Sequence, residues 1–404
     1  MKKSPGRKSL RSYIIRRFKT MRKKNSQDMG PMGAPPRQKG RAGKIIAKII
    51  RRFFLILFTL ILVALSILVI VMNQIFNGPS PAARDVLTMS LLEPSATKWI
   101  PGLFLDQSTI DEILAGVDAE LPEDVSNTDA VVIEKNSPES VLSQEWINAP
   151  DGIRFEEVKG DTFNAHVMVV RDPSRVYLGV SNREGFSRNV PGKRINEAME
   201  SEKASAAVNA GAFFDNGTAS PSVGSTPEGL VFSEQRCVWK TGAPPNGIKG
   251  FAGFNEDDIL VVHKDNISEA QAKELKIRDG CCFGPVLIMN GEINMEAYNK
   301  KSGWNPRTAI GQRADGAVIF VCIDGRQASS AGGEYKDVID IMVQFGAVNA
   351  CNMDGGSSSV MMYRDTTGRF GPAGEVRMMN SYSLLQSEPR RMPNYWMVRP
   401  ESED

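Results

Sequence analysis

The 404-residue chain contains an uninterrupted apolar stretch, residues 53–72, with 20 residues and no charge. At about 1.5 Å of rise per residue, a helix of this length crosses the roughly 30 Å hydrocarbon core of a bilayer. We therefore predict a single transmembrane helix over residues 53–72. This stretch would place the two parts of the chain that flank it on opposite sides of a membrane.

Charge is distributed unevenly about this stretch. Residues 1–52 hold 18 Lys and Arg and one acid, Asp28, whereas the remaining residues carry a net charge of −15. Basic residues at positions 44, 48, 51 and 52 directly precede the apolar run, and positively charged flanks stay in the cytoplasm. We expect residues 1–52 to form a basic, largely disordered cytoplasmic tail. Residues 73–404 would then be extracytoplasmic, anchored to the cell membrane.

Two alternatives concern the N-terminal part. The small residues at 79–83 would suit a cleaved signal peptide, but the basic segment and the apolar run are both longer than such peptides have. The basic tail would also suit nucleic acid. Its apolar positions 14, 15, 18 and 21 lie on one face of a basic amphipathic helix, which favours anionic lipid. We expect a membrane partner and no nucleic acid.

Composition divides the remaining chain near residue 152. Residues 73–151 combine a helical pattern at 108–117 with an acidic, polar connection, typical of a stalk. Residues 152–404 alternate apolar runs with helical patterns, which predicts one mixed α/β or α+β domain. Strands are expected at 165–170, 176–180, 206–208, 259–262 and 286–289, and a helix begins near 195.

The five cysteines and two histidines give no recognisable metal or triad motif. There is no C-x-x-C and no H-x-x-x-H, and a G-x-S-x-G elbow is also missing. Cys322 and Cys351 lie inside apolar runs, which favours buried, reduced thiols, although a disulfide stays open. His166 and His263 also lie in apolar runs and are interpreted as packing residues.

Two apolar runs, 317–323 and 347–353, each end in Asp-Gly, and apolar positions spaced as on a helix lie between them at 335–345. Strand, helix and strand predict a βαβ unit within a central mixed sheet, with its two strands parallel. Asp324 and Asp354 would then emerge at the same edge of the sheet, where ligands usually bind. The structural alternative is that each Asp-Gly simply makes a turn.

Residues around the two aspartates suit an anion. Arg307 and Arg326 could grip a phosphate through their planar guanidinium groups, or instead pair with the acids. Gly355, Gly356 and Ser357 could surround an anion with backbone N–H groups. A divalent cation, Ca²⁺ or Mg²⁺, bound by Asp324, Asp354 and Asn209 is a further alternative.

A second cluster follows the strand that ends at Asn209. Gly211 and Asp215 lie in the loop after it, and Gly229 precedes another apolar run. Glycines beside strand ends let a ligand approach the backbone closely, although an ordinary glycine-rich turn has the same composition.

These motifs together resemble the phosphodiester glycosidase family. The resemblance covers about residues 209–398. It rests on N-x-G-x-F-x-D at 209–215, G-P-x-x-I-x-N-G at 284–291, R-T-A-I-G at 307–311, D-G-R at 324–326, N-x-D-G-G-S-S at 352–358 and R-x-x-P-N at 390–394. The tail, span and stalk resemble membrane-anchored bacterial members described as acting in exopolysaccharide synthesis. One departure is visible, since Ala210 and Ala212 stand where the family motif usually has glycine.

The resemblance implies hydrolysis of the bond between a sugar's anomeric carbon and a phosphodiester oxygen, as in N-acetylglucosamine-type substrates. Asp324 and Asp354 would act as base or nucleophile near an oxocarbenium-like centre, while Arg307 and Arg326 hold the phosphate. The substrate-binding residues would be Asn209, Gly211, Asp215, Gly229, Thr308, Gly355, Gly356 and Ser357. The partner would be a sugar-phosphate glycopolymer or a glycolipid of the cell envelope.

Two other function classes stay open at this point. The same anion-gripping residues could hold an envelope glycopolymer without cutting it, which would make the chain a non-catalytic binding protein. Alternatively, the basic tail could be the functional part of a scaffold protein.

Overall fold

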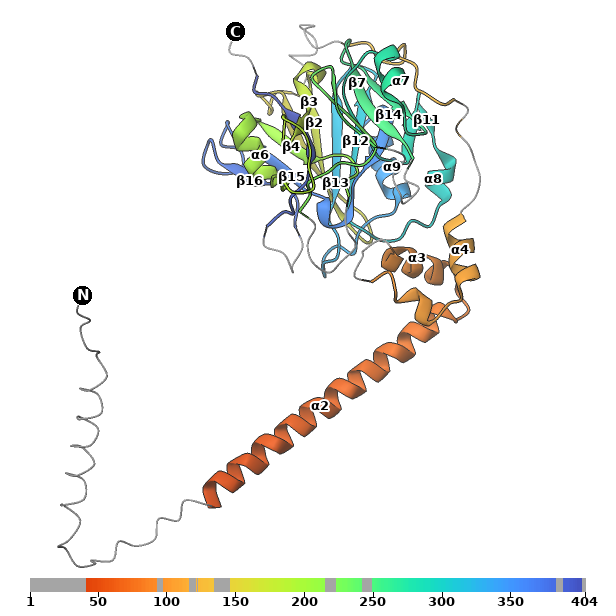
Figure 1. The fold of residues 1–404 in the computed structure, drawn as a ribbon, viewed down its shortest axis with the longest axis vertical. Coiled ribbons are helices and arrows are strands. Elements are labelled where there is room, and N and C mark those ends of the chain that lie inside the picture. The colour runs from red at the N-terminus through yellow and green to blue at the C-terminus, as the bar shows by residue number, and fades with distance from the viewer. Residues whose placement is uncertain are drawn as a thin grey trace, which may run out of the picture. The chain divides into compact units, whose positions relative to one another are not determined.

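The computed structural model describes residues 41–92, 97–115, 121, 123–133, 146–214, 223–241, 249–382 and 388–401. The chain divides into two units, residues 1–69 and 70–404. The described helices are α2 (Arg41–Phe76), α3 (Pro81–Leu92), α4 (Gln107–Ala115), α6 (Ile195–Glu202), α7 (Glu269–Glu274), α8 (Met295–Asn299) and α9 (Tyr335–Gln344), with the 3-10 turns η1 (Pro101–Leu103), η2 (Pro173–Arg175) and η3 (Gly356–Ser358) (Figure 1).

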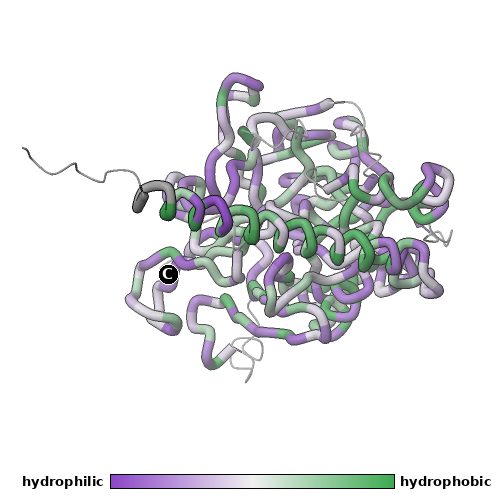
Figure 2. The backbone as a smooth tube through the Cα atoms, turned by 90° about the horizontal axis from the view of Figure 1, so that it is seen from below, coloured by the Kyte–Doolittle hydropathy of each residue, from purple (hydrophilic) through white to green (hydrophobic). Residues whose placement is uncertain are grey.

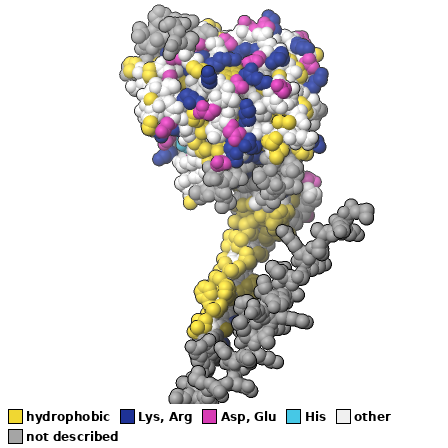
Figure 3. Space-filling model, turned by 60° about the vertical axis from the view of Figure 1, so that its left-hand side comes forward, with side chains coloured by type: hydrophobic (Ala, Val, Ile, Leu, Met, Phe, Trp, Pro, Cys, Tyr) yellow, Lys and Arg dark blue, Asp and Glu magenta, His cyan; other side chains and the backbone are white. Residues whose placement is uncertain are grey.

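Helix α2 contains the predicted span and extends beyond it at both ends. The part of it that could span a membrane, Ile45–Phe76, has 32 residues. The side chains of its most apolar window are not buried by the protein. Figure 2 shows the hydrophobic residues along this helix, and Figure 3 shows apolar side chains on its surface. Within the described residues, α2 is the one helix long and apolar enough to cross a membrane. The predicted tail up to residue 40 lies outside the described residues.

The second unit contains three antiparallel sheets. The seven-stranded sheet has the order β1 (Ile153–Lys159), β2 (Asn164–Val170), β13 (Val318–Ile323), β12 (Arg307–Arg313), β14 (Ala347–Met353), β10 (Val286–Met289) and β11 (Glu292–Ile293). One five-stranded sheet has the order β16 (Val376–Met378), β15 (Met361–Arg364), β4 (Ala206–Asn209), β17 (Asn394–Val398) and β3 (Val176–Val180). The other has the order β6 (Arg236–Lys240), β5 (Leu230–Ser233), β9 (Ile277–Cys282), β7 (Phe251–Asn255) and β8 (Leu260–His263).

The three sheets share one apolar core. Phe320, Trp396 and Phe254 come from different sheets and are buried together in it. The rings of Phe254 and Trp396 meet edge to face, with centroids 5.7 Å apart. Burial of this shared surface is the main force that holds the sheets together. The α+β fold class predicted from the sequence is therefore confirmed.

A helix covers the outer face of each sheet. Met342 of α9 packs on the seven-stranded sheet, Met199 of α6 on the sheet of β4, and Ala272 of α7 on the third sheet. Helix α9 shows how the local sequence determines where such a helix begins. The Glu334 N–H donates to Asp337 Oδ2 at 2.7 Å, which caps the helix start.

The predicted βαβ unit differs from the structure in its pairing. Strands β13 and β14 do run in the same direction, with α9 between them in sequence. However, β12 lies between them in the sheet and is antiparallel to both. The sheet therefore has antiparallel neighbours throughout, and the expected parallel pair does not form. The residues of β12 come before β13 in the chain. The spacing of the two Asp-Gly motifs therefore could not indicate that β12 lies between β13 and β14.

The described residues of the predicted stalk pack against the sheets. The Trp304 N–H donates to Ser90 Oγ of α3 at 2.7 Å, and Asn290 Nδ2 donates to Glu123 at 2.6 Å. The sequence predicted a capping box that begins at residue 108. In the structure the cap comes earlier, at Asp106, whose Oδ1 accepts the Thr109 N–H at 2.8 Å. This hydrogen bond lowers the pKa of Asp106.

All five cysteines lie in the described residues and are free thiols. Burial raises the pKa of Cys282 to about 11 and raises those of Cys281, Cys322 and Cys351 as well. Only Cys237 is partly exposed.

We predict that the native protein reacts with one equivalent of a thiol reagent such as dithionitrobenzoate, and the denatured protein with five. A thiol reacts as the thiolate, which burial disfavours at neutral pH. The Cys237→Ser variant should lose the native reaction and keep four equivalents after denaturation. Rapid labelling of two or more thiols in the folded protein would contradict this assignment.

Candidate functional site

The two aspartates lie at the same edge of the seven-stranded sheet. Asp324 follows β13 and Asp354 follows β14, and the start of β12 lies between those strand ends. Arg307 pairs with Ile323 and Thr308 pairs with Met353, which sets the register. Neighbouring strands are about 4.8 Å apart, so these two strand ends are separated by roughly 10 Å.

Asp324 is held by contacts to both of its carboxylate oxygens. Oδ2 lies 3.0 Å from His166 Nε2, and Oδ1 accepts the Ser381 N–H at 2.8 Å. The side chain is only 3% exposed. His166 was interpreted as a packing residue, and that interpretation is corrected here. Its position opposite Cys322 in the β2–β13 pair brings the imidazole to the carboxylate, a tertiary relation that the sequence could not indicate.

Asp354 is positioned through its backbone by β4. Its N–H donates to Ala210 O at 3.0 Å, and its carbonyl accepts Asn209 Nδ2 at 2.6 Å. Asn209 Oδ1 in turn accepts Thr308 Oγ1 at 2.8 Å and the Val360 N–H at 3.1 Å. One buried amide therefore ties together β4, β12, β15 and the Asp354 turn. Three residues predicted for the site, Asn209, Thr308 and Asp354, are adjacent.

Arg326 lies against the glycine-rich turn after Asp354. Its Nη2 is 3.3 Å from Asn305 Oδ1. A Cβ added to Gly356 would stand 3.2 Å from the same Nη2, so glycine leaves room for the guanidinium. Gly356 also has φ +60°, a conformation that glycine adopts without strain. The turn that contains Gly355 and Gly356 is thus shaped around an arginine.

Arg307 lies in a different environment from Arg326. It is 2% exposed, and its guanidinium donates to the carbonyls of Ser302, Gly303 and Gly333 at 2.7 to 3.1 Å. The same group lies 4.6 Å from the ring centre of Tyr335. These contacts favour a structural role for Arg307, fixing the loop before β12, over the phosphate-binding role expected from the sequence.

Ser357 brings two residues into the site that were not predicted. Its carbonyl accepts the Tyr382 hydroxyl at 2.6 Å, and its Oγ accepts Arg390 Nη1 at 3.3 Å. Arg390 also stacks 4.7 Å from the ring centre of Phe213. Burial raises the pKa of the Tyr382 hydroxyl. The charges of Arg390 and Arg326 lower this pKa and that of Asp354 raises it, so all three side chains act on the same hydroxyl. The R-x-x-P-N motif could have indicated Arg390, but no pattern marks Tyr382.

Two of the predicted glycines serve packing. A Cβ at Gly211 would come within 2.8 Å of the Cys281 Cβ, and one at Gly229 within 2.6 Å of the Cys282 Cβ. Gly229 also has φ +76°. Both glycines therefore allow β9 to approach closely, whatever ligand the site takes. Asp215 lies outside the described residues.

Several buried polar atoms near the two aspartates have no hydrogen-bond partner among the residues that the structure describes. These are Asn305 Nδ2, Asn352 Oδ1, Ser358 Oγ, Ser359 Oγ and Asn394 Nδ2. Each belongs to a residue at most 3% exposed. Burying such a group unpaired costs about 1–3 kcal/mol. Their concentration in the motifs around Asp354 is what a site built for a hydroxyl-rich or anionic ligand requires.

The predicted cation ligands do not fit a metal ion. Asn209 Oδ1 accepts two hydrogen bonds, and both Asp324 oxygens have protein partners. Among the described residues no group of three His, Cys, Asp or Glu could hold a metal.

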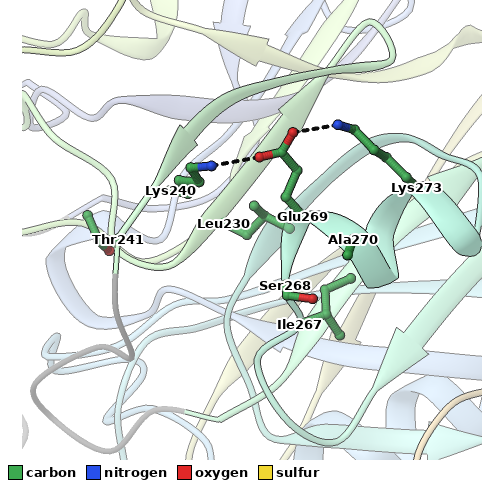
Figure 4. A pocket seen from close by; sticks show the side chains of 8 residues that line it. All are labelled: Leu230, Lys240, Thr241, Ile267, Ser268, Glu269, Ala270 and Lys273. Carbon is green, nitrogen blue, oxygen red and sulfur yellow. Dashed lines mark hydrogen bonds and ion pairs between the residues drawn. The ribbon is translucent and has the colours of Figure 1, made fainter.

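A cavity of about 810 Å³ lies away from these residues, between β6 and α7 (Figure 4). Glu269 bridges Lys240 and Lys273 at its wall, at 2.8 and 2.6 Å. The two ammonium groups lower the pKa of Glu269 to about 2. None of the site residues described above lines this cavity.

Comparisons with known proteins identify part of the chain. Residues 202–399 match the family model described as phosphodiester glycosidase. The uncharacterized, SPbeta prophage-derived protein YomE of Bacillus subtilis (strain 168) is 26% identical over 192 residues, which is 46% of this chain. The matched region spans only 27% of that relative.

Solved structures with a similar fold include the zebrafish N-acetylglucosamine-1-phosphodiester alpha-N-acetylglucosaminidase catalytic domain, auto-inhibited by its pro-peptide. It is 20% identical with a TM-score of 0.48, covering 64% of this chain and 86% of that one. A hypothetical protein from Synechocystis is 18% identical with a TM-score of 0.43, covering 62% and 63%.

We predict that Arg307→Met lowers the free energy of unfolding by about 3 kcal/mol, since three carbonyls lose a buried charged donor. Urea unfolding of the full chain in detergent, followed by tryptophan fluorescence, measures this loss. Arg236→Met is the matched control, because Arg236 is 68% exposed and its removal should cost less than about 1 kcal/mol. Unchanged stability of Arg307→Met together with lost ligand binding would instead support the anion-binding role.

Proposed function

Because residues 202–399 match the family model described as phosphodiester glycosidase, we propose that this protein hydrolyses the glycosidic bond of a sugar-1-phosphodiester. The observation that carries the proposal is the placement of Asp324 and Asp354 at strand ends on one sheet edge, with Arg326 against the glycine-rich turn. Glycosidases commonly work with two carboxylates about an oxocarbenium-like centre, and a guanidinium suits the phosphate.

In this proposal the phosphate leaves as a stable anion. It therefore needs less acid assistance than the alkoxide that leaves from an ordinary glycoside. Arg326, and Arg390 beside Ser357, supply positive charge for the departing phosphate. One carboxylate acts at the anomeric carbon, directly or through water. The contact with His166 orients the Asp324 carboxylate for its role in the reaction. The unpartnered amides and hydroxyls around Asp354 would bind the sugar's hydroxyl groups.

The membrane anchor belongs to the same proposal. Helix α2 is long and apolar enough to span a bilayer, and the positive residues that precede its apolar core favour a cytoplasmic N-terminus. The glycosidase domain would then act outside the cytoplasm on a phosphodiester of the cell envelope, either a glycopolymer or a glycolipid.

We predict that Asp354→Asn lowers kcat at least about 10³-fold, within the range for loss of an acid, base or nucleophile. The fold should persist, because the backbone contacts of Asp354 remain. The assay measures free sugar released from N-acetylglucosamine-1-phosphomethyl ester and related diesters by the full chain in nanodiscs.

Asp340→Asn serves as the control for Asp354→Asn, since Asp340 is exposed on α9 and its loss should leave turnover unchanged. Wild-type turnover by Asp354→Asn would refute the catalytic assignment. Retention of a sugar-phosphate polymer by the wild type without any release of sugar would favour the binding-protein alternative.

A further inference from the structure

A short turn, residues 97–105, lies directly beside the end of the apolar helix α2. We name it the juxtamembrane turn. Backbone hydrogen bonds from the Ile100 N–H to Thr97 O and from the Leu103 N–H to Ile100 O, at 2.9 and 3.0 Å, close it. Thr97 Oγ1 donates to Leu91 O of α3 at 2.8 Å, which fixes the turn on that helix.

The inner side of the turn packs on the last residue of α2. The rings of Phe104 and Phe76 are stacked, with centroids 5.0 Å apart and planes inclined by 12°. Phe76 is only 2% exposed, whereas most residues of α2 before it are exposed. The juxtamembrane turn is therefore continuous with the end of the helix that would leave the bilayer.

The outer side of the turn is apolar. Trp99 is 63% exposed and Leu103 is 65% exposed, and Lys98 beside them is exposed as well. Single exposed apolar residues are common on protein surfaces. Here two large ones lie on one short turn, next to a cation, where the chain leaves an apolar helix. Trp and Lys are the residues that settle at the headgroup level of membranes.

The same region is connected to the candidate site. Ser90 Oγ of α3 accepts the Trp304 N–H at 2.7 Å. A Cβ on Gly303 would stand 2.4 Å from Ser90 N, so α3 and this loop touch through their backbones. Arg307 holds the Gly303 carbonyl, and the loop continues to Asn305, which accepts a hydrogen bond from Arg326.

Chain length limits how far this loop can lie from α2. Only residues 77–89 separate Phe76 from Ser90, and those from 81 onward are helical. At about 3.4 Å per extended residue and about 1.5 Å per helical residue, the path is at most roughly 30 Å. Ser90, which contacts the loop beside Arg326, therefore lies within about that distance of Phe76 in the same unit.

We propose that the juxtamembrane turn lies in the lipid headgroup layer, with Trp99 and Leu103 as a second membrane contact beside α2. The substrate would then be a phosphodiester whose aglycone is a lipid of the same membrane. This last statement rests on the proposed function, whereas the membrane contact does not. A tether of this length favours a substrate held at the bilayer surface over a polymer far from it.

Fluorescence quenching tests the membrane contact. The full chain is placed in phosphatidylglycerol–phosphatidylethanolamine vesicles whose acyl chains carry bromine, and tryptophan quenching is compared with that in unbrominated lipid. The amount of emission lost to quenching should fall in Trp99→Phe and stay at the wild-type value in Trp239→Phe, because Trp239 lies on β6. Equal quenching in wild type and Trp99→Phe would overturn the contact. So would the finding that Trp99 is shielded from solvent only when the protein self-associates.

Activity tests the substrate class. In Trp99→Ser/Leu103→Ser, kcat/KM for a vesicle-embedded glycosyl phosphodiester with a long prenyl or acyl chain should fall about tenfold or more, the effect of losing interfacial apolar area. Turnover of a soluble methyl diester should not change. The control Val132→Ser/Ile147→Ser removes side chains 66% and 60% exposed elsewhere and should change neither rate.

The outcomes separate the two proposals. An equal loss on both substrates would overturn the assignment of a lipid-linked substrate. If the wild type cleaves neither diester, the proposed function fails, and the quenching result still decides whether the turn contacts lipid.

Discussion

The candidate site depends on one constraint, the insertion of β12 between two strands that run in the same direction. An antiparallel sheet alternates strand directions, so every second strand ends at the same edge. Strands β13 and β14 are such a pair, and each continues into an Asp-Gly turn. The strand between them brings its own first residues, Arg307 and Thr308, to that edge. The two acids thus share one edge because of this sheet topology, whereas His166, Ser381 and Asn209, which contact them, come from elsewhere in the fold.

The edge is held in place by buried polar contacts. Asn209 links three sheet strands and the Asp354 turn through a single side-chain amide. Arg307 fixes the preceding loop by donating to its carbonyls. Polar groups that are buried and fully bonded allow little movement, because each broken hydrogen bond leaves a costly unpaired group. Beside them stand amides and hydroxyls that the protein does not satisfy. A rigid frame with unsatisfied groups at its centre is suited to binding a polar ligand.

The loop before β12 also connects the site to the segment that follows α2. On one side Arg307 and Asn305 belong to the site, and on the other Gly303 and Trp304 touch α3. Helix α3 follows α2 after only a few residues. The residues that follow α2 thus pack on the domain, beside the loop that leads to the site.

The sequence by itself determined the features that depend on local pattern. The uncharged run predicted α2, and short apolar runs predicted strands such as β2, β3 and β10. The Asp-Gly motifs marked Asp324 and Asp354. The ordered motifs also predicted the family whose model matches residues 202–399. In each case the physical cause, hydrophobic periodicity or turn geometry, acts within a few residues of the chain.

Only the tertiary structure decided which strands became neighbours and what each side chain touched. The insertion of β12, the contact of His166 with Asp324 and the burial of Arg307 join residues far apart in sequence. The local sequence looks the same for an arginine that binds an anion and for one that stabilises a loop. The difference lies in which acceptors the fold brings to its guanidinium, and packing of three sheets on a shared core settles that.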